Sequence, residues 1–457
     1  MDPIAALARN IFFPLLTVYE KNNVRTHLKR LEESQYFTPE RIREIQLNRL
    51  MRLLQHAHAN CPFYRKRFDE AGLDPNRVRS LEDVRVLPVL TKRDIQDNLH
   101  SLRAANMPEQ DMLSDKTGGS TGSPLNFFVD RERYALRQAA GIRHDRWAGW
   151  NIGDRSAYLW GHREDFFAWQ GVKAGLRNWL VERRIFLDTS SITVARLAEF
   201  TQQLRSFRPK LFVAYANSMY LYARYLSETG TQDYHRPAAI ITSAELLEAH
   251  QRELIEQIFE CPVFDRYGCR EVGMIGSECE HHQGLHVCAE AILVETSIGG
   301  KPAAPDQAGK IIVTDLMNFG MPFIRYQIED VGSLSGKDCT CGRSLPLMNV
   351  AGGRITDFLV TPDGRIISGA SLTIYLIANA PGIAQAQIVQ EKKDEIIVRL
   401  VPGQGYGDET TRVLEKQLPD FFGPKVSFKF DVVGHIPVSA SGKHRFSISR
   451  LDPSEWF

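Results

Sequence analysis

The sequence lacks the features of several large classes of protein. No run of apolar residues reaches the ~20 that a membrane-spanning helix needs. The 457 residues carry 56 lysines and arginines against 55 aspartates and glutamates, so the net charge is +1. This balance provides no overall basic field for nucleic acid. We therefore expect neither a transmembrane segment nor a nucleic-acid partner.

Cysteine is scarce as well. The chain has seven cysteines, an odd number that is spread unevenly. A disulfide framework normally uses many paired cysteines in a short secreted chain. The cysteine usage therefore favours a reducing compartment, and we expect a cytoplasmic protein.

The segment at residues 4–18 is apolar but contains Arg9 and Pro14, and it has no basic leader or cleavage site. It indicates a docking helix rather than a signal peptide. Peripheral contact with a membrane surface is left open, because amphipathic helices use such residues to enter the interface. The residues concerned are Ile11, Phe12, Phe13, Leu15 and Leu16.

The hydrophobic content of 43% over this length is enough for large cores and two or more domains. Residues 20–105 predict helices, including a short one over Leu90–Leu99 that Thr91 would cap. After residue 125, strands and helices alternate, which predicts an α/β fold with a mainly parallel sheet and helices on both faces. Clear strands are Leu211–Ala214, Ala238–Glu245 and residues 261–268.

The pattern changes near residue 285, where strand runs separated by glycine-rich and proline-rich turns predict a β-rich subdomain over about 285–350. A glycine-rich joint follows at Ala351–Phe358, and beyond it the pattern is that of a smaller α/β unit. We place the boundary near Gly353, with domains at residues 1–353 and 354–457.

The run TGGSTGSP, Thr117–Pro124, combines three glycines with four hydroxyl side chains. Glycine lets backbone N–H groups turn inward and hydroxyls add donors, so the run favours a phosphate-binding loop. It is not a Walker loop, because that pattern requires a lysine. A glycine- and serine-rich surface turn is the alternative.

Four further stretches follow the glycine loop in order: ITSAE (241–245), DRYGCREVG (265–273), MPFIRYQIEDVG (321–332) and PVSASGKHR (437–445). With the loop, they resemble the adenylate-forming superfamily of acyl-CoA synthetases. The closest resemblance is to the phenylacetate-CoA ligase family and its capsular-polysaccharide-biosynthesis branch, and it covers roughly residues 50–450. It implies an adenylate-forming enzyme fold with a large first domain and a small mobile C-terminal domain.

The resemblance also implies a reaction. A carboxylic acid would be activated by ATP to an acyl-adenylate with release of pyrophosphate, and the acyl group would pass to coenzyme A, a carrier thiol or an amine. Negative charge accumulates in such a step, so the site needs donors, cations and Mg²⁺. The alternative is a non-catalytic nucleotide-binding component of a polysaccharide-biosynthesis assembly. A homodimer is left open.

Carried over by motif, the resemblance assigns the glycine loop to the β- and γ-phosphates of ATP. Leu125 stands where the family usually has the loop lysine, so less charge is delivered there. Lys443, Glu271 and Thr121 are the expected catalytic residues, with Glu271 binding Mg²⁺ and Lys443 bridging the carboxylate and α-phosphate. The loop residues are Thr117, Gly118, Gly119, Ser120, Thr121 and Gly122.

The other expected ATP-binding residues come from the strand ends. Tyr267 and Gly268 match the adenine platform, and Asp330 matches the carboxylate that accepts both ribose hydroxyls. Arg325 is expected near the ribose or phosphate. The segment that lines the adenine and acyl group matches Ser243, Ala244 and Glu245, and the joint after which the small domain rotates matches Gly353 and Arg354.

Each of these residues also has a structural interpretation. Tyr267 could be a core aromatic, Glu271 and Lys443 solvated surface residues, and Asp330 a turn aspartate. Glu245 could cap the next helix, since an acidic side chain is favourable there, and Arg325 could be a surface-paired arginine. Thr356 stands at the hinge position, where the family usually has aspartate or lysine, which weakens the thioester-forming step as a prediction.

Two stretches are rich in soft metal ligands, CEHHQGLH (279–286) and CTCGR (339–343). Three thiols and one imidazole form a common structural zinc set, and four protein ligands leave no open position for catalysis. We predict a Zn²⁺ site from Cys279, His286, Cys339 and Cys341, in places where the family also shows Cys and His. His281 or His282 could replace His286, and the alternative is free thiols.

The acid-binding groove is expected between the Trp147–His162 region and the turn at Tyr215–Ser218. His162 or Arg163 could meet a polar or anionic acid there. A structural hydrogen-bonding role for His162 is the alternative.

Overall fold

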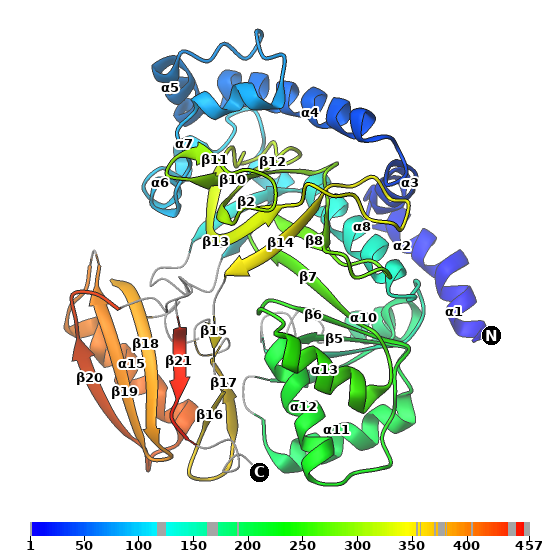
Figure 1. Ribbon diagram of the computed structural model, residues 1–457, viewed down its shortest axis with the longest axis vertical. Helices are drawn as coiled ribbons and strands as arrows, with labels where there is room; N and C mark the ends of the chain where they lie inside the picture. The colour runs from blue at the N-terminus through cyan, green and yellow to red at the C-terminus, as the bar shows by residue number, and fades with distance from the viewer. Residues whose placement is uncertain are drawn as a thin grey trace.

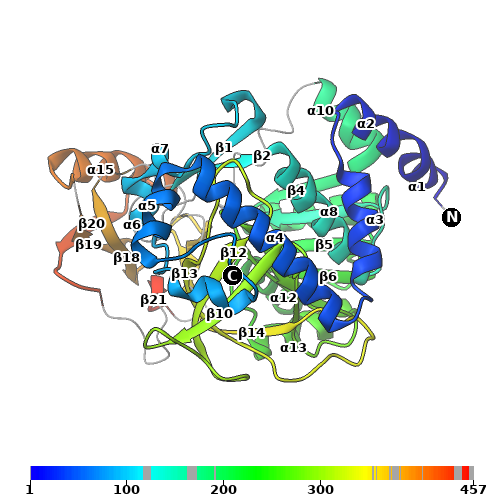
Figure 2. The same ribbon diagram turned by 90° about the horizontal axis from the view of Figure 1, so that it is seen from above.

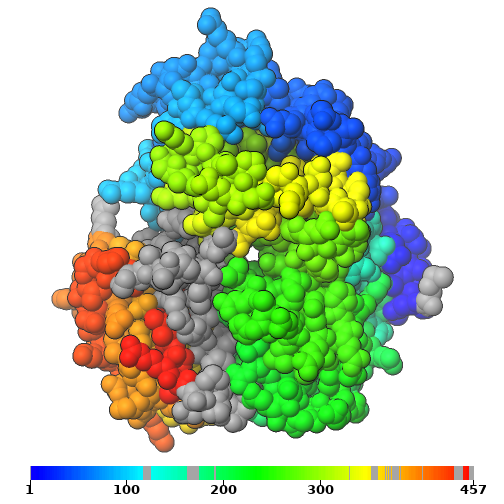
Figure 3. All heavy atoms as spheres, in the orientation of Figure 1, coloured from blue at the N-terminus to red at the C-terminus, as the bar shows by residue number. Residues whose placement is uncertain are grey.

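The computed structural model describes residues 2–116, 125–161, 172–189, 192–352, 355–356, 358–369, 372, 380, 382–403, 405–436 and 445–451. Figure 1 shows a large body built on one long sheet and a smaller body of strands at the C-terminal end. In the space-filling view the smaller body, coloured orange to red, occupies the lower left, and the green segment of the large body occupies the lower right (Figure 3).

Helices form the first part of the chain, as the sequence predicts. Thr38 and Thr91 accept hydrogen bonds from backbone N–H groups at the starts of their helices, and Gly72 ends another with a φ of +66°. The elements are α1 (Pro3–Leu7), η1 (Ala8–Phe12), α2 (Phe13–Tyr19), α3 (Val24–Ser34), α4 (Pro39–Asn60), α5 (Pro62–Ala71), η2 (Leu81–Val86), α6 (Lys92–Asp97), α7 (Leu99–Leu102) and η3 (Glu109–Asp111).

A 12-stranded sheet forms the centre of the large body, in the order β11-β10-β12-β13-β14-β9-β8-β7-β6-β5-β3-β4. Its last five strands in that order are parallel, which confirms the predicted α/β class. These are β3 (Ser156–Trp160), β4 (Arg184–Asp188), β5 (Leu211–Tyr215), β6 (Ala239–Ser243) and β7 (Val263–Cys269).

Helices cover both faces of the parallel strands. On β5, Leu211 and Val213 enter one hydrophobic cluster while Phe212 and Ala214 enter another. A strand buried on both faces reads as a continuous apolar run, as this one does. The helix on the first face is α8 (Arg131–Trp147), and those on the second are α11 (Val194–Phe207), α12 (Ala216–Glu228) and α13 (Ala249–Phe259).

The predicted β-rich segment continues the same sheet with antiparallel strands. The direction reverses at the turn between β7 and β8, where Gly268 packs so closely that a Cβ would lie 2.5 Å from the Gly273 carbonyl oxygen. The strands are β8 (Gly273–Ser277), β9 (Leu285–Val287), β10 (Ile292–Ile298), β11 (Lys301–Pro302), β12 (Gly309–Asp315), β13 (Tyr326–Leu334) and β14 (Leu347–Gly352).

A five-stranded sheet in the order β15-β21-β18-β19-β20 follows, with its own hydrophobic cluster. The predicted boundary near Gly353 lies between the last strand of the long sheet and the first of this one. The elements are β15 (Ile355–Thr356), β16 (Phe358–Val360), β17 (Ile366–Ser368), β18 (Ile383–Lys392), β19 (Glu395–Pro402), α15 (Asp408–Phe422), β20 (Ser427–Val432) and β21 (Arg445–Ser449). Outside both sheets lie the hairpin of β16 with β17, the hairpin of β1 (Met112–Lys116) with β2 (Asn126–Asp130), and α10 (Val172–Arg177) with η4 (Asn178–Glu182).

Buried arginines tie α8 to the rest of the large body. Arg133 forms an ion pair of 2.7 Å with Asp315, both side chains being 1% exposed, and donates to the Val272 carbonyl oxygen at 2.6 Å. Arg143 pairs with Glu290 at 2.6 Å in the same buried way. A buried charge is tolerated when it is paired and hydrogen-bonded, so these contacts fix the position of α8.

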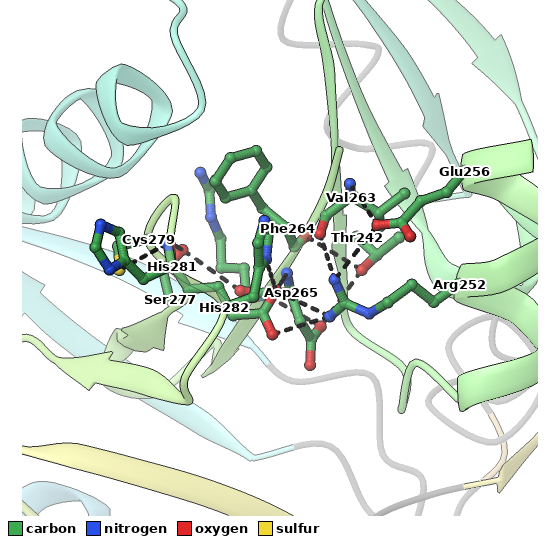
Figure 4. A network of polar contacts seen from close by, with 12 residues as sticks. Thr242, Arg252, Glu256, Val263, Phe264, Asp265, Ser277, Cys279, His281 and His282 are labelled. Atoms are coloured by element: carbon green, nitrogen blue, oxygen red, sulfur yellow. Dashed lines mark hydrogen bonds and ion pairs between the residues drawn. The ribbon is translucent and has the colours of Figure 1, made fainter. Parts of the chain in front are cut away.

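A second polar network holds β7 to α13 and to the turn after β8 (Figure 4). The Glu278 carboxylate accepts two hydrogen bonds of 2.9 Å from Arg252, one of 2.8 Å from the backbone N–H of Asp265, and contacts His282 Nδ1 at 3.1 Å. Burial, together with the negative charge of Glu278, raises the pKa of Asp265 to about 7. Asp265 is therefore a half-buried carboxyl group that loses its proton only near neutral pH.

We expect Arg133→Met to lower the free energy of unfolding by about 3–5 kcal/mol, because it leaves Asp315 as an unpaired buried charge. Urea unfolding of the full chain measures this. The matched control is Arg93→Met, whose ion pair with Asp97 spans 3.5 Å between side chains 87% and 55% exposed. That change should cost under about 0.5 kcal/mol. Equal losses in the two variants would contradict the proposed importance of the buried pair.

The raised pKa of Asp265 predicts a pH-dependent stability. Between the unfolded pKa of about 3.9 and the folded pKa, the folded protein keeps a proton that the unfolded chain has released. Stability from this residue is therefore complete below pH 4 and is lost as pH rises through 7. The Asp265→Asn variant has no carboxyl group at this position and does not suffer this loss. The free energy of unfolding of the variant minus that of the unmodified protein should therefore rise by roughly 2 kcal/mol from pH 5 to pH 8. Urea midpoints at both pH values test it, and a constant difference would refute it.

Candidate active site and metal centre

The site is built around the turn between β7 and β8, which carries Glu271. Asp115, near the end of β1, forms an ion pair of 3.2 Å with Arg270, the residue before Glu271. Strands β1 and β2 pair with each other, and the glycine loop is the segment that connects them. The base of the loop therefore lies beside Glu271. The loop residues themselves, Thr117, Gly118, Gly119, Ser120, Thr121 and Gly122, lie outside the described residues.

Glu271 is held in place from two sides. Its side chain is buried, and Oε1 accepts a hydrogen bond of 2.9 Å from the hydroxyl of Tyr326 on β13. Its backbone carbonyl accepts a hydrogen bond from Arg137 on α8, which also donates to the Arg270 carbonyl oxygen at 3.0 Å. The carboxylate is thus oriented before any ligand binds. The solvated-surface interpretation of Glu271 is wrong for this structure.

Tyr326 is a site residue that the sequence analysis did not single out. It lies within the MPFIRYQIEDVG stretch, directly after Arg325 and four residues before Asp330. Its position between Arg325 and Asp330 could have drawn attention to it. The sequence pattern alone does not show which of these side chains faces Glu271.

Tyr267 and Asp330, which come from different strands, meet in the structure. The Tyr267 hydroxyl donates a hydrogen bond of 2.8 Å to Oδ2 of Asp330. The predicted adenine platform and the predicted ribose-binding carboxylate are therefore adjacent. Gly268 leaves the backbone beside Tyr267 without a side chain, which permits the close approach of the β8 strand described above.

The segment after β6 forms the neighbouring wall. The Ser243 hydroxyl donates to the Arg266 carbonyl oxygen at 3.2 Å, and Ala244 adopts a φ of +68°. Glu245 Oε2 accepts a hydrogen bond of 3.0 Å from the backbone N–H of Asn217, in the first turn of α12. Glu245 thus caps α12, and not the next helix in the chain as the structural interpretation supposed. The residue before that helix, at its cap position, is Glu248.

Arg325 requires a correction. Its guanidinium pairs with Glu295 at 3.1 and 3.2 Å and donates to the carbonyl oxygens of Arg85, at 2.9 Å, and Leu87. The side chain is buried among these groups, so its donors are used inside the protein. The expectation that Arg325 approaches ribose or phosphate is not met. Instead, the Arg325 side chain joins the start of β13 to the C-terminal end of η2 and the residue after it.

Several predicted residues have no described position. Lys443 and Arg354 lie outside the described residues, as do Gly353 and both candidates for the acyl pocket, His162 and Arg163. Their roles remain predictions.

The predicted zinc ligands come together. The ligand atoms of Cys279, His286, Cys339 and Cys341 all lie within 4.8 Å of one another. The Sγ atoms of Cys279 and Cys339 are 3.7 Å apart, and His286 Nε2 is 3.3 Å from Cys341 Sγ. Around a tetrahedral zinc ion, sulfurs at ~2.3 Å from the metal lie roughly 3.7–3.8 Å apart. The four side chains therefore fit such an ion.

The protonation state and the contacts of His286 support the same set, whereas a metal would have to displace the proton of the buried Cys279 thiol. Burial raises the pKa of the Cys279 thiol to about 12 and lowers the pKa of His286 to about 4. His286 is thus neutral at physiological pH, which is the form that binds a metal. Its Nδ1 contacts the Leu345 carbonyl oxygen at 3.2 Å, which directs Nε2 toward the sulfurs.

The two alternative histidines have other partners. His281 Nδ1 contacts the Thr340 hydroxyl at 2.7 Å, and His282 contacts Glu278 in the network of Figure 4. Neither belongs to the group of four clustered ligands.

The sequence is similar to known proteins along most of its length. Residues 359–450 match the family described as the CapK C-terminal domain. Protein CapK of Staphylococcus aureus is 23% identical over 434 residues, which cover 89% of each chain. The phenylacetate-coenzyme A ligase of Thermus thermophilus is 26% identical over 345 residues, covering 70% of this chain and 72% of that protein.

Solved structures share the fold. A crystal structure of 2-hydroxyisobutyryl-CoA ligase in the thioesterification state has a TM-score of 0.61 at 20% identity, covering 89% of this chain and 90% of that one. The same enzyme in the postadenylation state has a TM-score of 0.59 and covers 92% and 91%. These similarities establish the fold.

Among the helices that the structure describes, none combines the length and apolar character needed to cross a bilayer. The match to CapK covers 89% of the chain, which agrees with the resemblance found in the five motifs. The chain is therefore a relative of CapK and of the phenylacetate-coenzyme A ligases, and it has the fold of the adenylate-forming CoA ligases.

Proposed function

We propose that the protein is an ATP-dependent, AMP-forming carboxylate ligase that makes an acyl-adenylate and releases pyrophosphate. The observation that carries this proposal is that Glu271 lies beside the base of the glycine loop and contacts β13, the strand whose Asp330 meets Tyr267. Two separate stretches of the chain, residues 265–273 and 321–332, supply these groups, and each group matches a different part of the bound nucleotide and its metal ion. A structural role alone gives no reason for this match.

The described residues have distinct tasks in this proposal. Asp330 offers carboxylate oxygens to the ribose hydroxyls, and Tyr267 offers an aromatic face to the adenine. Glu271 would hold Mg²⁺, because hard cations prefer carboxylate oxygens, and the bound ion supplies positive charge to the phosphates. Tyr326 keeps the Glu271 carboxylate in position. The glycine loop, with Thr121, would donate hydrogen bonds to the phosphates, and Lys443 and Arg354 would complete the site from the C-terminal part.

We propose a thiol, that of coenzyme A or of a carrier protein, as the acceptor of the acyl group. The relatives named as coenzyme A ligases support this choice. An amine is the second candidate, because the motifs resemble the capsular-polysaccharide branch of the family, in which an amide on a polysaccharide precursor is an option. The match of residues 359–450 to the CapK C-terminal domain agrees with that resemblance. The seven free cysteines and the use of ATP fit a cytoplasmic location.

The proposal predicts that Glu271→Gln lowers pyrophosphate exchange by about 10²-fold or more, because a charged group that acts on the transferring phosphate is removed. Exchange of labelled pyrophosphate into ATP, with a panel of carboxylic acids, measures this. Tyr326→Phe should cause a smaller loss and raise the Mg²⁺ concentration needed for half-maximal exchange. Glu253→Gln, an exposed glutamate on α13, is the matched control and should leave exchange unchanged.

Two results would contradict the proposal. One is full exchange in Glu271→Gln. The other is protein that binds ATP but shows no exchange with any acid, which would favour the non-catalytic nucleotide-binding alternative.

We further propose that the four-ligand cluster holds a structural Zn²⁺. It would join the turn after β8 to the segment before β14, and it would take no part in the chemistry because its four protein ligands fill the coordination sphere. Purified protein should contain about one zinc per chain by elemental mass spectrometry. Cys339→Ser should lose most of this metal and unfold at lower temperature. Cys261→Ser, at a half-buried thiol outside the cluster, should keep it. Equal zinc content in both variants would exclude the site.

A further inference from the structure

The first helix of the chain, α1 to α2, turns its apolar side outward. Leu7, Ile11, Leu15 and Val18 recur at intervals of four and three residues and are 44%, 45%, 61% and 70% exposed. Arg9, the one charged residue between positions 3 and 19, points the other way. It donates to the Ile152 carbonyl oxygen at 3.2 Å and lies 3.6 Å from Asp154. This arrangement is the reverse of an ordinary surface helix.

The helix is seated firmly, so its exposed side is a defined surface. Ala5 and Ala8 are buried against the turn at Gly153, where a Cβ would lie 2.6 Å from the Ala5 carbonyl oxygen and 2.7 Å from the Ala8 Cβ. Ion pairs hold both ends, from Asp2 to Arg183 at 2.8 Å and from Glu20 to Arg177. Phe12, Phe13 and Leu16, which the sequence also suggested for membrane contact, are half-buried.

A second pair of helical elements lies beside it and carries further exposed apolar side chains. Figure 2 shows α10 next to α2, and Glu20 and Arg177 join them. Leu176 and Trp179 on α10 and η4 are 54% and 64% exposed. We call this set the apolar face: Leu7, Ile11, Leu15, Val18, Leu176 and Trp179.

Next to the apolar face, a groove of about 240 Å³ separates the first helix from α3. Four cations line it, Arg9, Arg25, Lys29 and Arg146. Arg9 pairs with Asp154, Lys29 with Glu33 and Arg146 with Glu32, so the groove and its partners keep a net positive charge of one. Asn10 also lines the groove. Because Asn10 is next to Ile11 in the chain, the groove lies close to the apolar face. Arg25 and Lys29 lie on its exposed side. Residues 2–30 as a whole carry five lysines and arginines against two acids.

We propose that the apolar face docks onto the surface of a bilayer that contains anionic lipid, with lipid phosphates at the cationic groove. An uncharged helix face with an exposed tryptophan and adjoining cations suits the headgroup boundary, where apolar side chains enter and cations meet phosphate. A second copy of the chain is a poorer occupant. A two-fold contact through this face would place the two cationic grooves near each other, and like charges oppose such contact. This proposal does not depend on the proposed enzymatic activity.

Sedimentation of the full chain with lipid vesicles tests the proposal. Vesicles of phosphatidylcholine with phosphatidylglycerol should bind at least about tenfold more protein than phosphatidylcholine alone, and added salt should reduce the difference. The double variant Ile11→Glu, Leu15→Glu should lose binding to both. The double variant Arg25→Ser, Lys29→Ser should lower binding to the anionic vesicles by about tenfold. Its binding to vesicles of phosphatidylcholine alone should be unchanged.

Val432→Glu is the matched control, because it places a glutamate at an equally exposed apolar residue, 55% exposed, on β20. It should bind vesicles as the unmodified protein does. Circular dichroism checks that each variant is folded. Absence of vesicle binding, or equal loss in Val432→Glu, would overturn the proposal. So would a dimer by light scattering that the Ile11 and Leu15 changes dissociate without any vesicle binding, because the occupant would then be a second copy.

Discussion

The buried arginines of α8 are the constraint on which the site depends. A guanidinium that has left water needs charged or carbonyl partners, and Arg133 and Arg137 find theirs in Asp315 and in the backbone of residues 270–272. The turn that carries Glu271 is therefore fixed by hydrogen bonds that also stabilise the fold of the large body. A phosphate-handling site gains from this, because groups that are already oriented need no reorganisation when charge develops.

At the start of strand β13, two consecutive residues make contacts in different parts of the large body. Arg325 directly precedes the strand, and Tyr326 is its first residue. Arg325 is bound to Glu295 on one side, and Tyr326 reaches Glu271 on the other. Asp330, further along the same strand, meets Tyr267. One strand thus sets the positions of both predicted ligand-binding carboxylates, Glu271 through a hydroxyl and Asp330 directly. A shift of β13 would disturb both at once, which makes the Arg325–Glu295 contact important for the site although it lies outside it.

The sequence predicted the fold class, and it predicted which four cysteine and histidine side chains cluster, for physical reasons. Apolar runs such as 211–215 report burial on two faces, and close pairs such as Cys339 and Cys341 must lie near each other in any fold. It failed where orientation decides. Arg325 adopts a φ of +55°, which is uncommon outside glycine and which no sequence pattern revealed. The sequence favoured His286 but left His281 and His282 open as alternatives, because the contacts with Leu345 and Thr340 that separate His286 from His281 come from far away in the chain.

The first helix and the five-stranded sheet stand at opposite ends of the molecule in both ribbon views (Figures 1 and 2). Between them lies the long sheet, whose strands pair without interruption from β11 to β4. With the apolar face resting on a surface, the large body would therefore act as a spacer. The end that carries α15 and β20 would project into solution, where a bulky acceptor could approach it without steric conflict with that surface.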